Sequence, residues 1–204
     1  MENMDKTCPD LIQVLGSITP ISADFQQRIN DQLLHESFPA NKLLLRPGET
    51  ARRIYFIKKG MVRAYSIDQN GREITSWLMG PGELIISVHS FFSQRPGQEY
   101  IHVLQPAELQ SLTWNQLNAY YADYPEGNLI GRLLTQRYYI ISEERSILFR
   151  TTSPLERYHI LLDQHPKIEQ QTTQSNIASY LGITRETLSR LKSSLVRKPL
   201  TSNH

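Results

Sequence analysis

The sequence predicts an α+β chain in which N-terminal helices and a β-roll, or double-stranded β-helix, precede a long helix and a C-terminal helix-turn-helix. Residues 10–37 repeat apolar side chains every three to four positions, as amphipathic helices do. Residues 38–115 instead carry short apolar runs separated by turn residues, which is typical of a sandwich or closed roll. From Pro125 onward the helical spacing returns.

Composition places the chain among ordinary globular proteins. Its 204 residues are 39% apolar and 21% charged, enough to build a core of normal size. No run approaches the roughly 18 apolar residues of a membrane span, so we expect no membrane partner. The start, MENMDKTCPD, lacks the basic and apolar regions of a secretory signal, which predicts a cytoplasmic protein. The single cysteine, Cys8, excludes an internal disulfide.

Charge is unevenly distributed along the chain. From Arg145 to the end there are 9 basic and 4 acidic residues, a net charge of +5. The preceding residues carry 13 basic and 16 acidic residues, a net charge of −3. A basic C-terminal region is expected where a protein meets phosphate groups.

Residues 1–124 are predicted to hold the N-terminal helices and the roll. Strand candidates such as Arg53–Ile57 and Val62–Ile67 are each followed by turn residues. The pair Asn70-Gly71 predicts a hairpin, because both residues tolerate a positive φ.

Residues 125–150 are predicted to form a long dimerisation helix with two adjoining apolar stripes. One stripe, at residues 129, 133, 140 and 147, is expected to rest on the roll. The other is expected to pair with the same helix of a second copy, although packing inside one chain is the alternative. The residues predicted for this dimer interface are Ile130, Leu134, Ile141 and Leu148.

Residues 151–204 are predicted to contain two short helices that meet at a tight turn. Thr173 can cap the first helix, and Gly182 supplies the left-handed conformation that ends it. Thr184 can cap the second helix, whose residues Leu188 and Leu191 face back toward the first. This is the spacing of a helix-turn-helix, although an ordinary helical hairpin with solvated charges is the alternative.

The outward face of the second helix carries groups that can read DNA bases. Arg can donate two hydrogen bonds to guanine, and Glu can accept one from cytosine. The candidate base-reading residues are Arg185, Glu186, Ser189 and Arg190. Hydroxyl groups nearby can bind phosphates, which position the protein without specifying sequence. The candidate phosphate-binding residues are Thr173, Ser175, Thr184 and Thr187.

The string Arg185-Glu186-Thr187-Leu188-Ser189-Arg190, with the order of regions before it, resembles the Crp/Fnr family of bacterial regulators. The resemblance covers nearly the whole chain. It implies a homodimeric, non-enzymatic transcription regulator in which Arg185, Glu186 and Arg190 read a palindrome of TGTGA-like half-sites. Half-site centres should lie about 34 Å apart, one helical turn of DNA. RNA polymerase and a small-molecule effector are further candidate partners.

The resemblance also implies a cyclic-nucleotide cassette in the roll, and here the chain departs from the family. The opening glycine is present as Gly82, but Ile86 or Ser87 stands where the family has its ribose-binding Glu. Gly97 or Gln98 stands where the family has its phosphate-binding Arg. Without that charge-assisted contact we expect no cyclic AMP and no cofactor, and either another ligand or none. The candidate pocket residues are Gly82, Ile86, Ser87, His89, Phe91, Gln98 and Tyr100.

Other readings of the chain stay open. A cyclic-AMP-responsive regulator is one, and a roll-shaped interaction module that no longer binds DNA is another. A cupin-like metal enzyme would need clustered ligands, whereas His89 and His102 are isolated, so no metal site is expected. Only nine residues follow Leu195, which predicts little or no C-terminal wing after the second helix.

Overall fold

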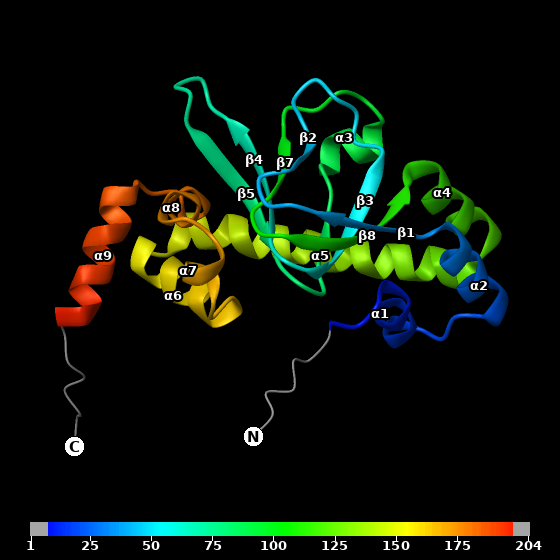
Figure 1. The fold of residues 1–204 in the computed structure, drawn as a ribbon. Helices are drawn as coiled ribbons and strands as arrows, with labels where there is room; N and C mark the ends of the chain where they lie inside the picture. Colours follow the sequence, from blue (N-terminus) through cyan, green and yellow to red (C-terminus); the bar gives the residue numbers. More distant parts are fainter. Residues whose placement is uncertain (1–7, 198–204) are drawn as a thin grey trace, which may run out of the picture.

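The computed structural model describes residues 8–197. The chain forms a β-roll that lies along one long helix, with further helices gathered at both ends of that helix (Figure 1). The α+β class, the roll and the long helix are confirmed. The predicted lack of a wing concerns residues that lie outside the described range.

Two N-terminal helices, α1 (Leu11–Ile18) and α2 (Ala23–Gln32), cover one end of the long helix. Ser22 caps α2 by accepting a hydrogen bond from the backbone N–H of Phe25 at 3.3 Å. Phe25 and Ile29 are buried there in a shared apolar cluster that also contains Ile130 of the long helix. The N-terminal segment is therefore part of the core.

The roll consists of two four-stranded antiparallel sheets. Its strands are β1 (Leu34–Phe38), β2 (Leu43–Leu45), β3 (Arg53–Lys59), β4 (Val62–Ile67), β5 (Glu73–Met79), β6 (Leu84–Ile85), β7 (Tyr100–Val103) and β8 (Ala107–Thr113). One sheet has the order β1-β8-β3-β6 and the other the order β2-β7-β4-β5. A short helix, α3 (Val88–Ser93), closes the roll between β6 and β7.

The β4–β5 hairpin turns where Asn70-Gly71 predicted. Gly71 has a φ of +76°, whereas Asn70 does not take a positive φ. The carboxylate of Asp68 accepts hydrogen bonds from the backbone N–H groups of Asn70 and Arg72 instead. Asp68 thus closes the turn, and the hairpin extends beyond the rest of the roll (Figure 1).

Helix α4 (Trp114–Asp123) leads into the long helix α5 (Pro125–Thr151), whose 27 residues span about 40 Å. Four more helices follow: α6 (Pro154–Gln164), α7 (Ile168–Gln171), α8 (Gln174–Leu181) and α9 (Arg185–Arg197). Met61 and Leu78 of the roll are buried in the same cluster as residues of α6, α7, α8 and α9. The C-terminal helices therefore share a core with the roll. No helix in the described range is long and apolar enough to cross a membrane.

Candidate nucleic-acid interface

Helices α8 and α9 meet at a turn fixed by local hydrogen bonds. The Thr173 hydroxyl accepts a hydrogen bond from the N–H of Asn176 at 3.2 Å and so caps α8. Gly182 ends α8 at a φ of +68°, and the N–H of Ile183 returns to the carbonyl of Ala178 at 3.0 Å. The Thr184 hydroxyl then accepts from the N–H of Thr187 at 3.2 Å and caps α9.

The apolar edges of the two helices bury each other and leave one face of α9 in solvent. Ile177 and Leu188 are both 0% exposed, which fixes the rotation of α9 about its axis. The four candidate base-reading residues, Arg185, Glu186, Ser189 and Arg190, are all exposed on the opposite face. Hydrogen bonds at the helix N-terminus, from backbone and from the Thr184 hydroxyl, hold the pKa of Glu186 below its usual value. Its carboxylate therefore stays ready to accept hydrogen bonds.

The candidate phosphate-binding hydroxyls lie at the N-terminal ends of both helices. Thr173, Ser175 and Thr184 are exposed, and Thr187 is half-buried with its hydroxyl 3.1 Å from that of Thr184. Because Thr173 caps by accepting, its hydroxyl hydrogen remains free to donate, whereas the Thr184 hydroxyl already contacts Glu186. The positive end of each helix dipole lies there as well.

Two arginines, one from α5 and one from α6, bind the C-terminal end of α8. Arg145 of α5 donates from Nη2 to the carbonyl of Tyr180 at 2.8 Å, and its guanidinium lies 3.6 Å from the centre of the Tyr180 ring. Arg157 of α6 donates to the carbonyl of Leu181 at 3.2 Å. Both cations face the negative end of the α8 dipole. Burial lowers the pKa of Arg145 from its usual value, yet the group stays charged.

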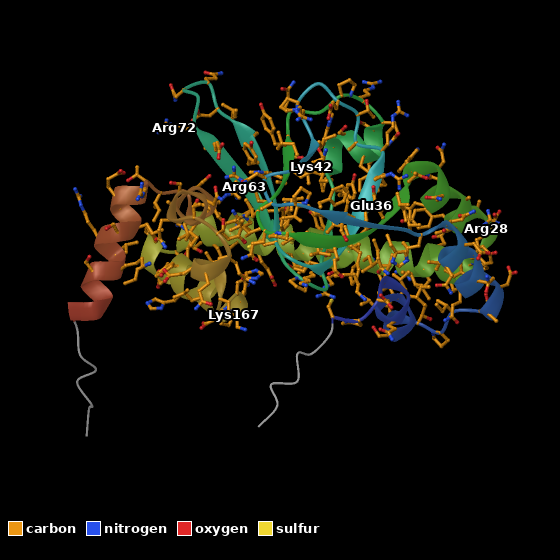
Figure 2. The ribbon with its side chains drawn as sticks, in the orientation of Figure 1. Arg28, Glu36, Lys42, Arg63, Arg72 and Lys167 are labelled. Carbon is orange, nitrogen blue, oxygen red and sulfur yellow. The ribbon has the colours of Figure 1, made fainter. Side chains whose placement is uncertain are left out.

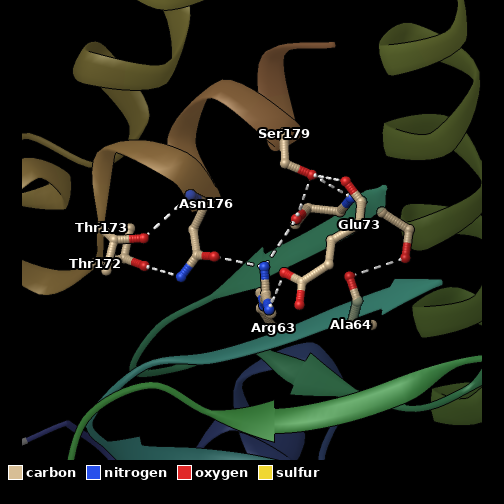
Figure 3. A network of polar contacts seen from close by, with 9 residues as sticks. Arg63, Ala64, Glu73, Thr172, Thr173, Asn176 and Ser179 are labelled. Carbon is tan, nitrogen blue, oxygen red and sulfur yellow. Dashed lines mark hydrogen bonds and ion pairs between the residues drawn. The ribbon is translucent and has the colours of Figure 1, made fainter. Parts of the chain in front are cut away.

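A second set of contacts holds α8 against the roll (Figure 3). Arg63 of β4 is 3% exposed, and it contacts Glu73 at 2.6 Å and the side-chain oxygen of Asn176 at 2.5 Å. The Ser179 hydroxyl accepts from the N–H of Thr75 at 2.9 Å and donates to the carbonyl of Glu73 at 2.6 Å. We call these residues of β4, β5 and α8 the roll clasp.

The roll clasp was not predicted from the sequence, although one signal was available. Arg63 stands between the apolar residues Val62 and Ala64 and is the only charged residue of its strand. A charge in that position must either reach solvent or find a buried partner. Its partners lie 10 and 113 positions away in the chain, so no local pattern identifies them.

The residues predicted for the effector pocket have different surroundings in the structure, and the pocket stays a prediction. His89 and Gln98 are exposed. Gly82 lies in the exposed turn before β6, where an added Cβ would be 3.9 Å from the sulfur of Cys8. Phe91 is 0% exposed and packs edge-on against Trp114, as a core residue. Ile86 packs against the core of the roll. Tyr100 stacks on Tyr65 with ring centres 4.7 Å apart.

Ser87 alone of that set belongs to a polar site inside the roll, and its partner is a residue that sequence analysis missed. The Ser87 hydroxyl donates to the carboxylate of Glu99 at 2.6 Å, and Ser76 donates to the other oxygen of the same carboxylate at 3.1 Å. Gly97 is closely packed, since a Cβ there would lie 2.9 Å from the Cβ of Ser90. A phosphate in the cassette region would meet the carboxylate of Glu99 and a closely packed loop, and both disfavour its binding.

Comparison with known proteins identifies relatives of this chain. Residues 35–124 match the family model of the cyclic nucleotide-binding domain. The global nitrogen regulator of Nostoc sp. is 26% identical over 182 residues, which cover 83% of this chain and 81% of that protein. The chain is a homologue of the Crp/Fnr regulators. The global nitrogen regulator of Synechocystis sp. is 28% identical over 123 residues, covering 58% of this chain and 54% of that protein.

Solved structures show the same fold for this Crp/Fnr homologue. FixK2 from Bradyrhizobium japonicum superposes with a TM-score of 0.72 at 17% identity, covering 84% of this chain and 89% of FixK2. A regulator of the Crp/Fnr family from Eubacterium rectale superposes with a TM-score of 0.70 at 16% identity, covering 90% and 88% of the two chains. At these identities the likeness concerns the fold. The curated relatives are regulators rather than enzymes.

In this Crp/Fnr homologue part of the α5 stripe predicted for the dimer interface is covered within the chain itself. Ile130 is 4% exposed and belongs to the core shared with α1 and α2, and Leu134 packs against the same core. Ile141 and Leu148 are half-buried. The exposed apolar side chains of α5 include Ile140 at 55% and Ile147 at 53%, which belong to the other stripe. The N-terminal helices account for this difference, because they cover the side of α5 that carries Ile130.

The described residues contain no group of three or more His, Cys, Asp or Glu side chains that could hold a metal ion. His102 lies on β7 beside Tyr65, and its Nδ1 is buried without a hydrogen-bond partner. Burial and the nearby charge of Arg63 lower the pKa of His102, which favours the neutral ring.

Proposed function

We propose that this chain is a homodimeric, sequence-specific DNA-binding transcription regulator whose α9 reads base edges in the major groove. One observation carries the proposal: Arg185, Glu186, Ser189 and Arg190 share an exposed face of α9 while Leu188 is fully buried behind them. Bidentate arginine contacts to guanine and a carboxylate contact to cytosine give the expected TGTGA-like half-site its chemical basis.

An apolar stripe of α5 supports the homodimer. The half-buried Leu133 and the exposed Ile140 and Ile147 recur every seven residues, which is the repeat that pairs two helices in a coiled coil. A twofold dimer would present two α9 helices to half-sites centred about 34 Å apart. We therefore move the proposed interface to this stripe.

Fluorescence anisotropy with the full chain tests the proposal. The probes are a duplex with two inverted TGTGA half-sites, the set of its single-base variants and a scrambled duplex, each at several salt concentrations. We expect Arg185→Ala to weaken binding to the palindrome by about 1–3 kcal/mol and to relax the preference at one base pair. The matched control is Arg72→Ala, an exposed arginine on the β4–β5 hairpin (Figure 2).

Two results would contradict the base-reading role. In the first, the Arg185→Ala variant loses affinity equally for every duplex, as a phosphate contact would. In the second, the unmodified chain binds the palindrome and the scrambled duplex alike at every salt concentration.

We also propose that cyclic AMP does not bind the cassette of the roll. The roll then responds either to another ligand or to no ligand at that site. The carboxylate of Glu99 lies between Ser76 and Ser87, and its charge would repel a cyclic phosphate. Calorimetric titration with cyclic AMP should give no binding heat, and micromolar binding would overturn this part.

A further inference from the structure

The short helix α3 leaves two large apolar side chains in solvent. Val88 and Phe92 are 51% and 45% exposed, and because they lie four positions apart they share one face of the helix. Phe92 meets the half-buried Trp114 of α4 edge-on, with ring centres 6.1 Å apart. We call these three residues the α3 patch. Single exposed apolar residues are ordinary on a protein surface, whereas neighbouring ones mark a contact surface.

The backbone beneath the α3 patch is fixed by hydrogen bonds to the start of β3. The Ser90 hydroxyl accepts from the N–H of Ala51 at 2.9 Å, and the Gln94 side chain donates to the carbonyl of Ala51 at 3.2 Å. The N–H of Trp114 donates to the carbonyl of Arg52 at 2.9 Å. The patch is therefore preformed, and a partner that binds it would order little of this chain.

Positive charge surrounds the α3 patch. Residues 46–53 and 88–96 contain four arginines and one acidic residue, Glu49, a net charge of +3. Residues 1–144 as a whole carry a net charge of −3, so this excess is local. Three of the arginines are exposed and form no ion pair within residues 8–197, and these are Arg46, Arg52 and Arg95.

Backbone connections place these arginines at the rim of the α3 patch. Arg52 adjoins the patch through the hydrogen bond described above, and Arg95 follows directly after the C-terminal cap of α3. The N–H of Gly48 donates to the carbonyl of Gly97 at 2.9 Å, so the loop with Arg46 runs beside the loop with Arg95. An apolar centre with aromatic rings and an arginine rim is the usual composition of a protein–protein interface.

The charge and the apolar centre together indicate the chemistry of the partner. Carboxylates complement unpaired arginines, and aromatic or aliphatic side chains would cover the apolar centre. A nucleic acid would satisfy the arginines through its phosphates, but it would leave aliphatic surface such as Val88 uncovered. The helices α3 and α9 lie far apart, with the β4–β5 hairpin between them (Figure 1). A partner on α3 would thus leave α9 free.

We propose that the α3 patch is the docking surface for a partner protein, which binds through an acidic segment that carries aromatic or aliphatic side chains. The apolar side chains of that segment cover the patch, and its carboxylates pair with the arginines of the rim. This docking is independent of the DNA-binding function proposed above.

Selection from a random peptide library on phage, with the full chain as bait, tests the chemistry of the partner. We expect the enriched peptides to combine Asp or Glu with Phe, Trp or Leu. Enrichment of basic or wholly polar peptides, or of no sequence class, would overturn the proposal.

Fluorescence anisotropy with the most enriched peptide then locates its site on the full chain. Val88→Ser/Phe92→Ser should weaken binding at least about tenfold, as the loss of central apolar anchors does. The matched control is Ile67→Ser/Ile74→Ser, which removes a pair of similar exposure, 49% and 48%, from the β4–β5 hairpin and should change nothing. Equal affinity of the two double variants would place the peptide elsewhere and contradict the docking surface.

The rim is tested separately, with variants that leave the α3 patch intact. Arg52→Gln/Arg95→Gln should weaken peptide binding at least about threefold at low salt and reduce its salt dependence. The control Arg72→Gln/Lys167→Gln removes two exposed cations far from α3 (Figure 2) and should keep both properties. The same salt dependence in both double variants would rule out the arginine rim.

Two other occupants of the α3 patch are distinguished with the same proteins. If the palindromic duplex displaces the peptide, the arginines bind nucleic acid and the docking proposal is wrong. If Val88→Ser/Phe92→Ser converts a sedimenting dimer to a monomer, the patch joins two copies of this chain and the proposal is equally wrong. We expect neither result. Peptide binding that persists in a chain without specific DNA binding would refute the proposed function and leave the docking surface standing.

Discussion

At the scale of single residues, Gly182 joins the two parts of the proposed DNA-reading unit. It needs a left-handed backbone, with a φ of +68°, and it also packs against the ring of Phe149. Either requirement alone favours glycine, and both apply here. The turn between α8 and α9 is therefore constrained by α5 as well as by its own backbone.

Replacing this glycine separates the two requirements. Gly182→Ala should destabilise the fold by about 1–2 kcal/mol for the backbone strain and by a further 1–3 kcal/mol or so because the Phe149 ring must move. Gly71→Ala is the matched control, since Gly71 has a φ of +76° but nothing lies within 4 Å of an added Cβ. Urea unfolding of both variants gives the comparison. Equal losses in the two variants would mean that the Phe149 contact does not matter.

Glu169 gives a prediction about pH. Lys192 of α9 and the hydroxyl of Tyr158 both contact one of its carboxylate oxygens at 2.5 Å, and these contacts hold the pKa of Glu169 below its usual value. A carboxyl group whose folded pKa is depressed adds stability above its unfolded pKa, and that stability is lost as pH falls through the folded value. The stability advantage of the unmodified chain over Glu169→Gln should thus be full at pH 7 and shrink steadily below about pH 4.5.

Urea midpoints of the two chains at pH 7, 5, 4 and 3 measure this. Glu144→Gln, an exposed residue on α5, serves as the control for a general loss of negative charge. A difference between the chains that stays constant with pH would show that Glu169 is not held by these contacts.

At the scale of elements, the β4–β5 hairpin and α8 behave as one unit because of the roll clasp. Asn176 is central to it, since its side chain accepts from Arg63 and donates to the Thr172 hydroxyl at 2.8 Å. Asn176→Ala leaves a donor of the buried Arg63 without that partner, and we expect a loss of about 1–3 kcal/mol. Hydrogen exchange should rise in α8 and in β5 together.

Ser175→Ala, at the exposed neighbouring position, is the control and should change neither exchange rates nor stability. Faster exchange confined to α8 in the Asn176→Ala variant would indicate that α8 is not held by the roll.

The same elements show what the sequence could predict and what it could not. The turn residues and short apolar runs between 38 and 115 predicted the roll because a closed sheet needs both, and local chemistry specifies both. Apolar spacing likewise predicted α5 and its two stripes. Which stripe faces inward depends on what covers the helix, and Ile130 is covered by α1 and α2. The contacts of Glu99 and Arg63 were not predicted for a related reason, since their partners in the sheets and in α8 are brought close only by folding.

At the scale of the whole molecule, α5 connects every part. Its first half shares a core with the N-terminal helices, its middle faces the roll, and its last turns hold α8 through Arg145 and Phe149. Its uncovered side carries Ile140 and Ile147. An apolar stripe that remains exposed along such a connecting helix is costly unless a partner covers it.

Charges placed in this stripe should separate the dimer. We expect the double variant Ile140→Glu/Ile147→Glu to sediment as a monomer at micromolar concentrations, because pairing would bury four carboxylates without partners. The control is Ile67→Glu/Ile74→Glu, two isoleucines of similar exposure, 49% and 48%, on the β4–β5 hairpin. Since a twofold palindrome binds two α9 helices at once, the monomer should also lose at least about a hundredfold in affinity for it and keep its weak affinity for a single half-site. A dimer that survives the charged stripe while the hairpin control dissociates would place the interface on the hairpin instead.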